Sequence, residues 1–490
     1  MQYKYFLTQA YFLFMERESL LLLVDKNIIA AITSVQAWHY HIFPREVHSG
    51  SISLFGTPAS ISAKGELEVI LSKEVSIQLL AEDEMERLLN LYYKREKNDS
   101  RINSLNYNGS QDDFLQNLIT EAKRLKSSDI HIEIYEERCR IRIRIDGQLV
   151  ERYTVERQHY ASIINKIKIM SSLDISEKRL PQDGRIFFSE AGSKFDIRVS
   201  ILPILHGEKV VLRLLNNDAT EIDLYKLGFS DRDLANYLEG VKKPNGLFLI
   251  SGPTGSGKTT TLYATLKLLN KDSRNITTIE DPIEYTLEGI NQVQLKESIG
   301  FTFPAALRNF LRQDPNVIMV GEIRDPETAN MAIRASLTGH LVLSTIHTNS
   351  AWGTVARLID MGIPPFLVAD TLNTSVAQRL VRVLCPHCKR SEPFSKAILP
   401  SKFIPWKKLN NHFVAAGCPE CFMTGYLGRK AVYEVIPIDL DLANAIKAAS
   451  YQITSILAER GIRTLSENAF GLLESGETSL DEVFPLLINY

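Results

Sequence analysis

The sequence predicts an α/β fold for the longer, C-terminal part of the chain, preceded by an α+β domain and a small N-terminal domain. Three observations carry this prediction. Apolar runs alternate with stretches of helical spacing in the C-terminal part, period-two alternation marks strands in the middle, and two polar segments separate the parts. The predicted ranges are 1–95 for the small domain, 96–111 for a linker, 112–215 for the α+β domain, 216–230 for a second linker and 231–490 for the α/β domain.

Length and composition restrict the possible functions. The 490 residues exceed what one ordinary core holds, so several domains are expected. The 56 Lys and Arg against 58 Asp and Glu give a net charge of -2, whereas dedicated nucleic-acid-binding proteins usually carry a basic domain. No stretch supplies the roughly 20 apolar residues that cross a bilayer, and the apolar run at 5–15 lacks a signal-peptide cleavage site. We therefore expect a cytoplasmic protein.

The middle domain is predicted to start with a helix and to continue with strands. The helix is expected to begin near Asp112 or Asp113, and the ranges 130–134 and 139–145 alternate as strands do. One face of the second strand carries three arginines, Arg140, Arg142 and Arg144. Such a stripe is commonly the solvent side of a sheet, and contact with a phosphate or a partner is the alternative.

Residues 252–259, GPTGSGKT, match the phosphate-binding pattern G-x-x-x-x-G-K-[ST]. An apolar run at 247–250 precedes the pattern and leucines at helical spacing follow it, which argues against a chance glycine-rich turn. Glycines let backbone N–H groups surround phosphate oxygens at the positive end of the next helix. Lys258 is then expected to reach the β- and γ-phosphates of ATP, and Thr259 to hold Mg²⁺. The predicted nucleotide-binding residues are Gly252, Pro253, Thr254, Gly255, Ser256, Gly257, Lys258, Thr259 and Thr260.

Hydrolysis would also need a carboxylate at the end of a neighbouring strand, to order Mg²⁺ and the attacking water. The apolar run 317–321 ends in Glu322, which is the candidate for this role. A second predicted strand, at 275–279, is followed by acids, and either Glu280 or Glu284 could orient water. Acids at strand ends are common on protein surfaces, so these assignments depend on the phosphate-binding loop.

Two histidines, His340 and His347, bracket a further apolar strand at 341–346. A histidine in this position is often a core residue whose ring nitrogens have hydrogen-bond partners within the fold. Beside a phosphate-binding loop, sensing of the γ-phosphate is the favoured interpretation.

Four of the five cysteines form two C-x-x-C pairs, Cys385 with Cys388 and Cys418 with Cys421, and 29 residues lie between the pairs. Four thiolates can surround Zn²⁺ tetrahedrally in a closed, structural site. Paired disulfides are the alternative, and a reducing cytosol disfavours them. The intervening residues are expected to form a small excursion, and the fifth cysteine, Cys139, is expected to be an inert buried thiol.

Four blocks in this order resemble the ATPases of type II secretion and type IV pilus assembly, a branch of the hexameric secretion motors. The blocks are the phosphate-binding loop, 278–285, 311–325 and 338–349, and the similarity extends over about 112–438. In that family they are the Walker A, Asp, Walker B and His boxes. The resemblance implies a RecA-like P-loop ATPase domain at 231–490, with a zinc insertion at about 383–423. Pilus-retraction motors typically lack the four cysteines, which argues against retraction.

The resemblance also implies roles outside the loop. Glu280, Glu284 and Glu322 would prepare water and metal, and His340 and His347 would sense the γ-phosphate. The family uses arginines from the preceding domain and from around the Walker B block, which correspond to Arg198 and Arg213 and to Arg308 and Arg312. Guanidinium groups suit this use because they stabilise charge on the transferring phosphoryl group.

The function implied by the resemblance is a cytoplasmic, homo-hexameric ATPase, peripheral to the bacterial inner membrane. It would power type IV pilus assembly or type II secretion through an inner-membrane platform protein, with residues 1–95 as an adaptor. The sequence leaves open which of the two processes is served. A DNA-translocating or conjugation-type motor is the alternative, which the neutral charge disfavours, and we expect no nucleic-acid partner. A non-enzymatic scaffold is a further alternative, which the occupied motifs disfavour.

Overall fold

The structure is a computed structural model that describes residues 28, 31–48, 50–71, 73–93, 111–190, 193–215, 223–400, 403–407, 409–450 and 453–488. The chain divides into two compact units, Met1–Leu105 and Asn106–Tyr490. Almost all of the predicted linker at 96–111 and the first seven residues of the one at 216–230 lie outside the described residues, as does the apolar run at 5–15. In the part of the chain that is described, no helix is both long enough and apolar enough to cross a bilayer.

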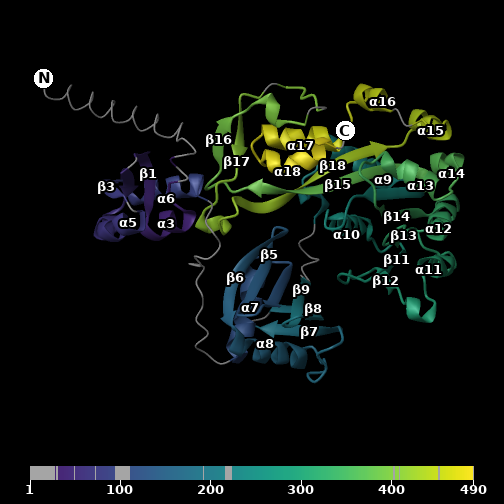
Figure 1. The fold of residues 1–490 in the computed structure, drawn as a ribbon. Helices are drawn as coiled ribbons and strands as arrows, with labels where there is room; N and C mark the ends of the chain where they lie inside the picture. The colour runs from purple at the N-terminus through teal and green to yellow at the C-terminus, as the bar shows by residue number, and fades with distance from the viewer. Residues whose placement is uncertain are drawn as a thin grey trace. The chain divides into compact units, whose positions relative to one another are not determined.

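The N-terminal unit contains a three-stranded sheet and short helices (Figure 1). Strand β2 pairs antiparallel with β1 and parallel with β3, and the core includes Ile42, Leu54 and Leu89. Thr33 caps the first described helix, because its Oγ1 accepts a 3.2 Å hydrogen bond from the Gln36 N–H. The elements are α3 (Ser34–Tyr40), β1 (Ile42–Val47), β2 (Ser51–Gly56), α4 (Pro58–Ser62), α5 (Lys64–Leu71), β3 (Glu74–Leu79) and α6 (Glu82–Tyr92).

The second unit begins with an α+β domain in which two helices cover one face of a six-stranded antiparallel sheet (Figure 1). The strand order is β6-β5-β4-β9-β8-β7. The predicted helix and the two predicted strands are confirmed as α7, β4 and β5. The elements are α7 (Gln111–Arg124), β4 (Asp129–Ile134), β5 (Arg138–Ile145), β6 (Gln148–Glu156), α8 (Arg157–Met170), β7 (Gln182–Glu190), β8 (Ser193–Ile204) and β9 (Gly207–Leu215).

The three arginines on β5 are half-buried and form ion pairs with carboxylates. On a simple solvent face they would instead be hydrated. Arg140 and Arg142 both donate to the carboxylate of Glu133 on β4, with the shortest contacts at 2.9 and 2.7 Å. Arg144 donates to Asp129 Oδ2 at 3.0 Å. The stripe therefore belongs to the domain's own ion-pair network.

The α/β domain is built on a seven-stranded sheet of order β12-β11-β13-β14-β10-β15-β18. All neighbouring pairs are parallel except β15 with β18, which is antiparallel. The elements up to β15 are η2 (Leu224–Lys226), α9 (Asp231–Lys242), β10 (Gly246–Ser251), α10 (Lys258–Leu269), β11 (Ile276–Glu280), β12 (Asn291–Gln294), η3 (Glu297–Ile299), α11 (Phe303–Phe310), β13 (Val317–Val320), α12 (Pro326–Leu337), β14 (Leu341–Ile346), α13 (Gly353–Asp360), α14 (Pro365–Thr371) and β15 (Leu372–Leu384).

Strand β10 lies in the middle of this sheet and is buried on both faces. Leu247 and Leu249 join the core that contains α11 and α12, whereas Phe248 and Ile250 join the core that contains α9 and α10. Two-sided burial explains why the strand reads as a continuous apolar run rather than an alternating one. The loop after it therefore starts from a fixed point at the carboxyl edge of the sheet, where ligands bind in open α/β folds.

The remaining elements follow β15. A two-stranded antiparallel sheet, β16 with β17, lies in the sequence between the two cysteine pairs and supplies the expected excursion. Strand β18 then returns along β15, with Ala431 buried in regular pairing opposite Leu380. The elements are β16 (Arg390–Pro393), η4 (Lys396–Ile398), β17 (Asn411–Val414), η5 (Pro419–Cys421), β18 (Tyr426–Pro437), α15 (Leu440–Lys447), α16 (Thr454–Glu459), α17 (Leu465–Glu474) and α18 (Leu480–Ile488).

Candidate functional site

Three glycines shape the loop that connects β10 to α10. Gly252, Gly255 and Gly257 have φ angles of 152°, 80° and 86°, in the region that glycine adopts without a Cβ penalty. A Cβ on Gly252 would lie 2.5 Å from the carbonyl oxygen of Gln378 in β15, and one on Gly257 would lie 2.8 Å from Gln378 Nε2. The backbone of the neighbouring strand thus leaves no room for a Cβ at Gly252, whereas at Gly257 the positive φ angle is the stronger reason for glycine.

Lys258, the first residue of α10, reaches back across this loop. Its Nζ donates to the carbonyl oxygens of Gly252 at 2.8 Å and Pro253 at 3.0 Å. Burial lowers the pKa of the Lys258 ammonium. The partners of this buried ammonium in the loop are neutral carbonyls, which do not balance its charge. The site is therefore suited to bind an anion, because a bound anion would supply the missing negative charge.

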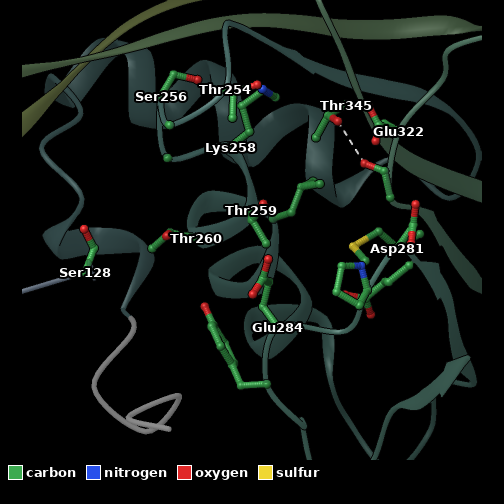
Figure 2. Close-up of a pocket in the computed structure, with 18 of the residues that line it drawn as sticks. Ser128, Thr254, Ser256, Lys258, Thr259, Thr260, Asp281, Glu284, Glu322 and Thr345 are labelled. Carbon is green, nitrogen blue, oxygen red and sulfur yellow. Dashed lines mark hydrogen bonds between the residues drawn. The ribbon is translucent and has the colours of Figure 1, made fainter. Parts of the chain in front are cut away.

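The loop opens into a cavity of about 620 Å³ (Figure 2). This volume lies within the range of about 300–1,000 Å³ that is usual for small-molecule sites. The predicted nucleotide-binding residues that line it are Thr254, Gly255, Ser256, Gly257, Lys258, Thr259 and Thr260. Figure 2 shows Lys258, Thr259, Glu284 and Glu322 around this space. All three predicted acids line the same cavity.

Glu280, at the end of β11, is buried and fully engaged. Its Oε1 accepts hydrogen bonds from Thr278 Oγ1 at 2.5 Å and from Gln292 Nε2 at 3.1 Å. Its Oε2 accepts from the hydroxyl of Tyr263 on α10. Burial and this carboxylate raise the pKa of Tyr263, so the phenol stays a donor. Glu280 therefore ties β11 to α10.

Glu284 is more accessible and faces the α+β domain. Arg198 on β8 places Nη2 3.6 Å from Glu284 Oε2 and 3.1 Å from the carbonyl oxygen of Ile283. The backbone N–H of Glu284 donates to Tyr263 Oη at 3.3 Å. The segment after β11 is thus held from α10 on one side and contacted by a predicted arginine on the other.

Glu322 follows β13 and lies between the side chains of His347 and Arg324. His347 Nε2, just past the end of β14, lies 3.4 Å from Glu322 Oε2, and the Arg324 guanidinium pairs with Oε1. Because parallel strands bring their carboxyl ends to one edge, residues 25 positions apart in the sequence meet here. The side chain of Glu322 is only 15% exposed, so both partners act in a partly desolvated setting.

The α+β domain adds Ser128 and Arg213 to the lining of the cavity. Arg213 on β9 donates through Nε to Asp129 Oδ1 at 3.0 Å, and its side chain is 60% exposed. Burial would raise the pKa of Asp129, but hydrogen bonds from Arg213 and Ser128 and the charge of Arg144 hold it below its usual value. Asp129 is therefore a carboxylate that positions Arg213.

Six of the predicted nucleotide-binding and catalytic residues do not line the cavity, namely Gly252 and Pro253 of the loop, Arg198 of the α+β domain, and His340, Arg308 and Arg312. His340 lies at the opposite end of β14 from His347, where its Nδ1 is 2.9 Å from the carbonyl oxygen of Ala335. Arg308 on α11 pairs with Glu327 at 2.8 Å, and Arg312 is exposed and bonds to Asn309 on the same helix. The roles of His340, Arg308 and Arg312 stay predictions, and any contact of these three with a nucleotide would have to involve another copy of the chain or a different arrangement of domains.

The cavity also contains residues that the motif analysis did not select, namely Tyr285, Phe303, Arg324, Thr345 and Arg429. Arg324 had a sequence signal, since it follows Glu322 by two residues at the end of an apolar strand. Arg429 comes from β18, about 170 residues after the loop, and only the antiparallel pairing of β18 with β15 brings it here. Tyr285 and Thr345 lie within the blocks 278–285 and 338–349, whereas no local pattern indicated Phe303.

The four cysteines meet as the spacing predicted. Their sulfur atoms all lie within 4.8 Å of one another, with Sγ–Sγ distances of 3.9 Å for Cys385–Cys418 and 3.8 Å for Cys388–Cys421. Tetrahedral Zn–S bonds of about 2.3 Å require separations of about 3.8 Å. Two backbone N–H groups donate to Cys421 Sγ at 3.2 Å, as is suitable for a thiolate. The donor set fits a tetrahedral metal ion of the zinc type.

The fold and the cavity define a P-loop nucleotide-binding protein with a Cys₄ insertion. A family model described as type II/IV secretion system protein matches residues 106–485. The chain belongs to the type II/IV secretion system protein family, which confirms the resemblance and the fold class predicted from the sequence.

Individual relatives agree with this membership. Type II secretion system protein E of Pseudomonas aeruginosa is 48% identical over 371 residues, covering 75% of this chain and 73% of that protein. The type IV pilus assembly ATPase PilB of Myxococcus xanthus is 47% identical over 372 residues, covering 75% and 66%. The type II secretion system ATPase E of Vibrio cholerae is 40% identical over 457 residues, covering 87% and 90%.

Solved structures share the fold. The pilus retraction motor PilT with bound ADP matches with a TM-score of 0.51 and 26% identity, covering 76% of this chain and 96% of that one. The ATPase DotB of Legionella pneumophila matches with a TM-score of 0.58 at 21% identity, covering 77% and 96%.

Proposed function

We propose that this chain is a cytoplasmic ATPase that works as a homo-hexamer at the inner membrane and powers type II protein secretion or type IV pilus assembly. The observation that carries the proposal is the single cavity lined by the phosphate-binding loop, the Glu322–His347 pair and Arg213 of the α+β domain. The relatives named above include proteins of both processes.

Lys258 and the backbone N–H groups of the loop would bind the phosphates of ATP, and Thr259 with the nearby acids would hold Mg²⁺. The bound Mg²⁺ would neutralise charge on the transferring phosphoryl group. Among the acids, Glu284 suits the orientation of water better than Glu280, because both oxygens of Glu280 already accept hydrogen bonds within the fold. Glu322 would fix the position of the attacking water or of the metal, with its own orientation set by His347 and Arg324.

Hydrolysis would change the interactions of the α+β domain through two of its arginines. Arg213 lines the cavity, and Arg198 contacts Glu284 and the carbonyl oxygen of Ile283 next to it. Phosphoryl charge that appears or leaves in the cavity would change the charge that these two arginines face. The movement of one domain against the other would follow, and an inner-membrane platform protein would use it. Residues 1–95 would serve as the adaptor to the membrane machinery.

The cysteine cluster would bind Zn²⁺ as a structural ion. Cys385 directly follows β15, and Cys421 precedes β18 by five residues, so the metal would fasten the far ends of these paired strands. The zinc would then support β18, which carries Arg429 into the nucleotide cavity.

Hydrolysis of ATP by the purified full-length chain tests the enzymatic part of the proposal. Lys258→Ala should abolish phosphate release, while Lys271→Ala, at an exposed lysine just after α10, should retain it. Equal activity in the two variants would contradict the assignment of this cavity. Co-purification with an inner-membrane platform protein of a pilus or of a secretion system would then identify the process served.

A further inference from the structure

Three arginines stand side by side across three strands of the α+β domain. Arg185 on β7 is the register partner of Arg198 on β8, and Arg198 is the register partner of Arg213 on β9. Directly paired residues project from the same face of a sheet. The next residues, such as Ile186 and Ile197, are buried in the core, so the three arginines lie on the opposite face. We call this row the arginine ladder.

The ladder lines a groove of about 530 Å³. Asp183, Ser200 and Val211 complete its polar and apolar walls. Arg213 lines both this groove and the nucleotide cavity, whereas Arg185 lines the groove and is absent from the residues lining the nucleotide cavity. The ladder therefore leads from the nucleotide cavity to the outer strand of the domain.

The guanidinium groups of the ladder are only partly engaged by other residues. Like charges on directly paired positions are unfavourable. Arg213 is paired with Asp129, and Arg198 lies 3.6 Å from Glu284. Within the described ranges, the side chain of Arg185 makes no hydrogen bond or ion pair, and the buried Nε of Arg198 has no hydrogen-bond partner. The carboxylate of Asp183 also lines the groove, so what the groove offers to a small oxyanion is the unused guanidinium donors of Arg185 and Arg198 rather than a surplus of charge.

We propose that the arginine ladder binds the inorganic phosphate that hydrolysis releases, with Arg185 as its outer ligand. This inference rests on the proposed function, because ATP hydrolysis is the source of that phosphate. Guanidinium groups bind phosphate oxygens through paired N–H donors, and adjacent guanidinium groups can pass a phosphate from one to the next. The transfer makes and breaks hydrogen bonds only. It would separate phosphate from the phosphate-binding loop while ADP is still bound.

Titration of inorganic phosphate into the full-length chain saturated with ADP and Mg²⁺ tests this site. Arg185→Ala should raise the dissociation constant for phosphate by about tenfold, as expected for the loss of one charged hydrogen-bond donor. Arg185→Lys should have an intermediate effect, because lysine keeps the positive charge but lacks the paired N–H donors of a guanidinium group. The matched control is Arg138→Ala, at an exposed arginine at the start of β5, which should leave the constant unchanged. Equal constants for Arg185→Ala and Arg138→Ala would overturn the proposal.

A second titration, with a non-hydrolysable ATP analogue, separates free phosphate from a γ-phosphate that is still attached. Arg185→Ala should alter the affinity for the analogue no more than Arg138→Ala does. An equal loss for analogue and phosphate would overturn the assignment to released phosphate. A change in oligomeric state with unchanged phosphate affinity would assign the ladder to a subunit contact and likewise overturn it. Both titrations can be read in a chain that does not hydrolyse ATP, so failure of the proposed function would be recognised separately.

Discussion

His347 Nε2 lies 3.4 Å from Glu322 Oε2, so the ends of β14 and β13 meet inside the nucleotide cavity. The same carboxylate pairs with Arg324 through its other oxygen. Contacts on both of its oxygens fix the orientation of the Glu322 carboxylate. His347 and Glu322 therefore act as a unit, and a substitution of either residue should disturb the other.

Glu322→Gln should retain ATP binding and lose turnover. The amide keeps the shape of the side chain but cannot act as a carboxylate toward water or metal, and the loss of such a group typically lowers kcat by about 10²–10⁴-fold. Nucleotide titration and steady-state phosphate release measure the two quantities. Glu288→Gln, at an exposed acid after the Glu284 segment, is the control. Undiminished hydrolysis would remove Glu322 from the mechanism.

Arg213→Ala should reduce kcat by about 10²-fold or more, with a smaller effect on ATP affinity, if its guanidinium stabilises charge that develops during phosphoryl transfer. The domain should stay folded, because Asp129 keeps its bond to Arg144. Circular dichroism and single-turnover kinetics check the two halves of this expectation, and Arg138→Ala again serves as the control. Normal single-turnover rates would exclude a contribution of Arg213 to chemistry.

Metal analysis of the full-length chain should find about one zinc ion per molecule. Cys388→Ser should lose the metal and lower Tm, because the ends of β15 and β18 are then no longer fastened. Cys139→Ala should retain the metal, since Cys139 lies in the core of the α+β domain, where burial raises the pKa of its thiol to about 12. A zinc-free protein with an unchanged Tm would contradict the structural role of the cluster.

Glu133 should make the stability of the α+β domain depend on pH. Burial opposes its ionisation, but hydrogen bonds from Arg142 and Arg140 outweigh burial and lower the pKa of Glu133 from 4.5 to about 2. A pKa that is lower in the folded state means that the stabilisation is present above pH 4.5 and is lost as the pH falls toward 2. Glu133→Gln should therefore cost up to about 3 kcal/mol at pH 7, and the difference should shrink below pH 4.5.

Hydrogen exchange of the β4 and β5 amides in the full-length chain, followed with increasing urea between pH 3 and 7, measures this difference. Glu137→Gln, at an exposed position in the turn before β5, is the control and should show no such dependence. A constant difference between wild type and Glu133→Gln across this range would contradict the assigned pKa.

The parts of the site that lie next to a strand end could be predicted from the sequence. Glu280, Glu322 and His347 lie at or just after the end of an apolar strand, and Lys258 ends the loop that follows another. Parallel pairing brings the ends of these strands to one edge. Arg429 was missed as a lining residue because its place depends on β18 pairing with β15, which is a long-range event. His340 flanks the same strand as His347 but lies at its amino end, away from the cavity, so its role stays a prediction.

The fold was predictable where one face or both faces of an element are apolar. The alternation in β4 and β5 and the apolar runs of β10, β13 and β14 indicated strands directly. The pairing of the arginines on β5 was not predictable, because Glu133 lies opposite Arg140 only in the register that the sheet adopts. Ion pairing across strands depends on register, and register is set by the whole sheet.

Gln378 gives the phosphate-binding loop a dependence that its eight residues do not reveal. Its carbonyl oxygen and its side-chain amide occupy the space that any Cβ on Gly252 or Gly257 would need, and its Oε1 accepts a 2.9 Å hydrogen bond from Thr261. The conformation of the loop therefore depends on packing against a strand that follows it by more than a hundred residues. If the eight-residue segment were grafted into another scaffold, the contacts from Gln378 that shape it would be missing. A functional graft would therefore need a counterpart of β15 as well.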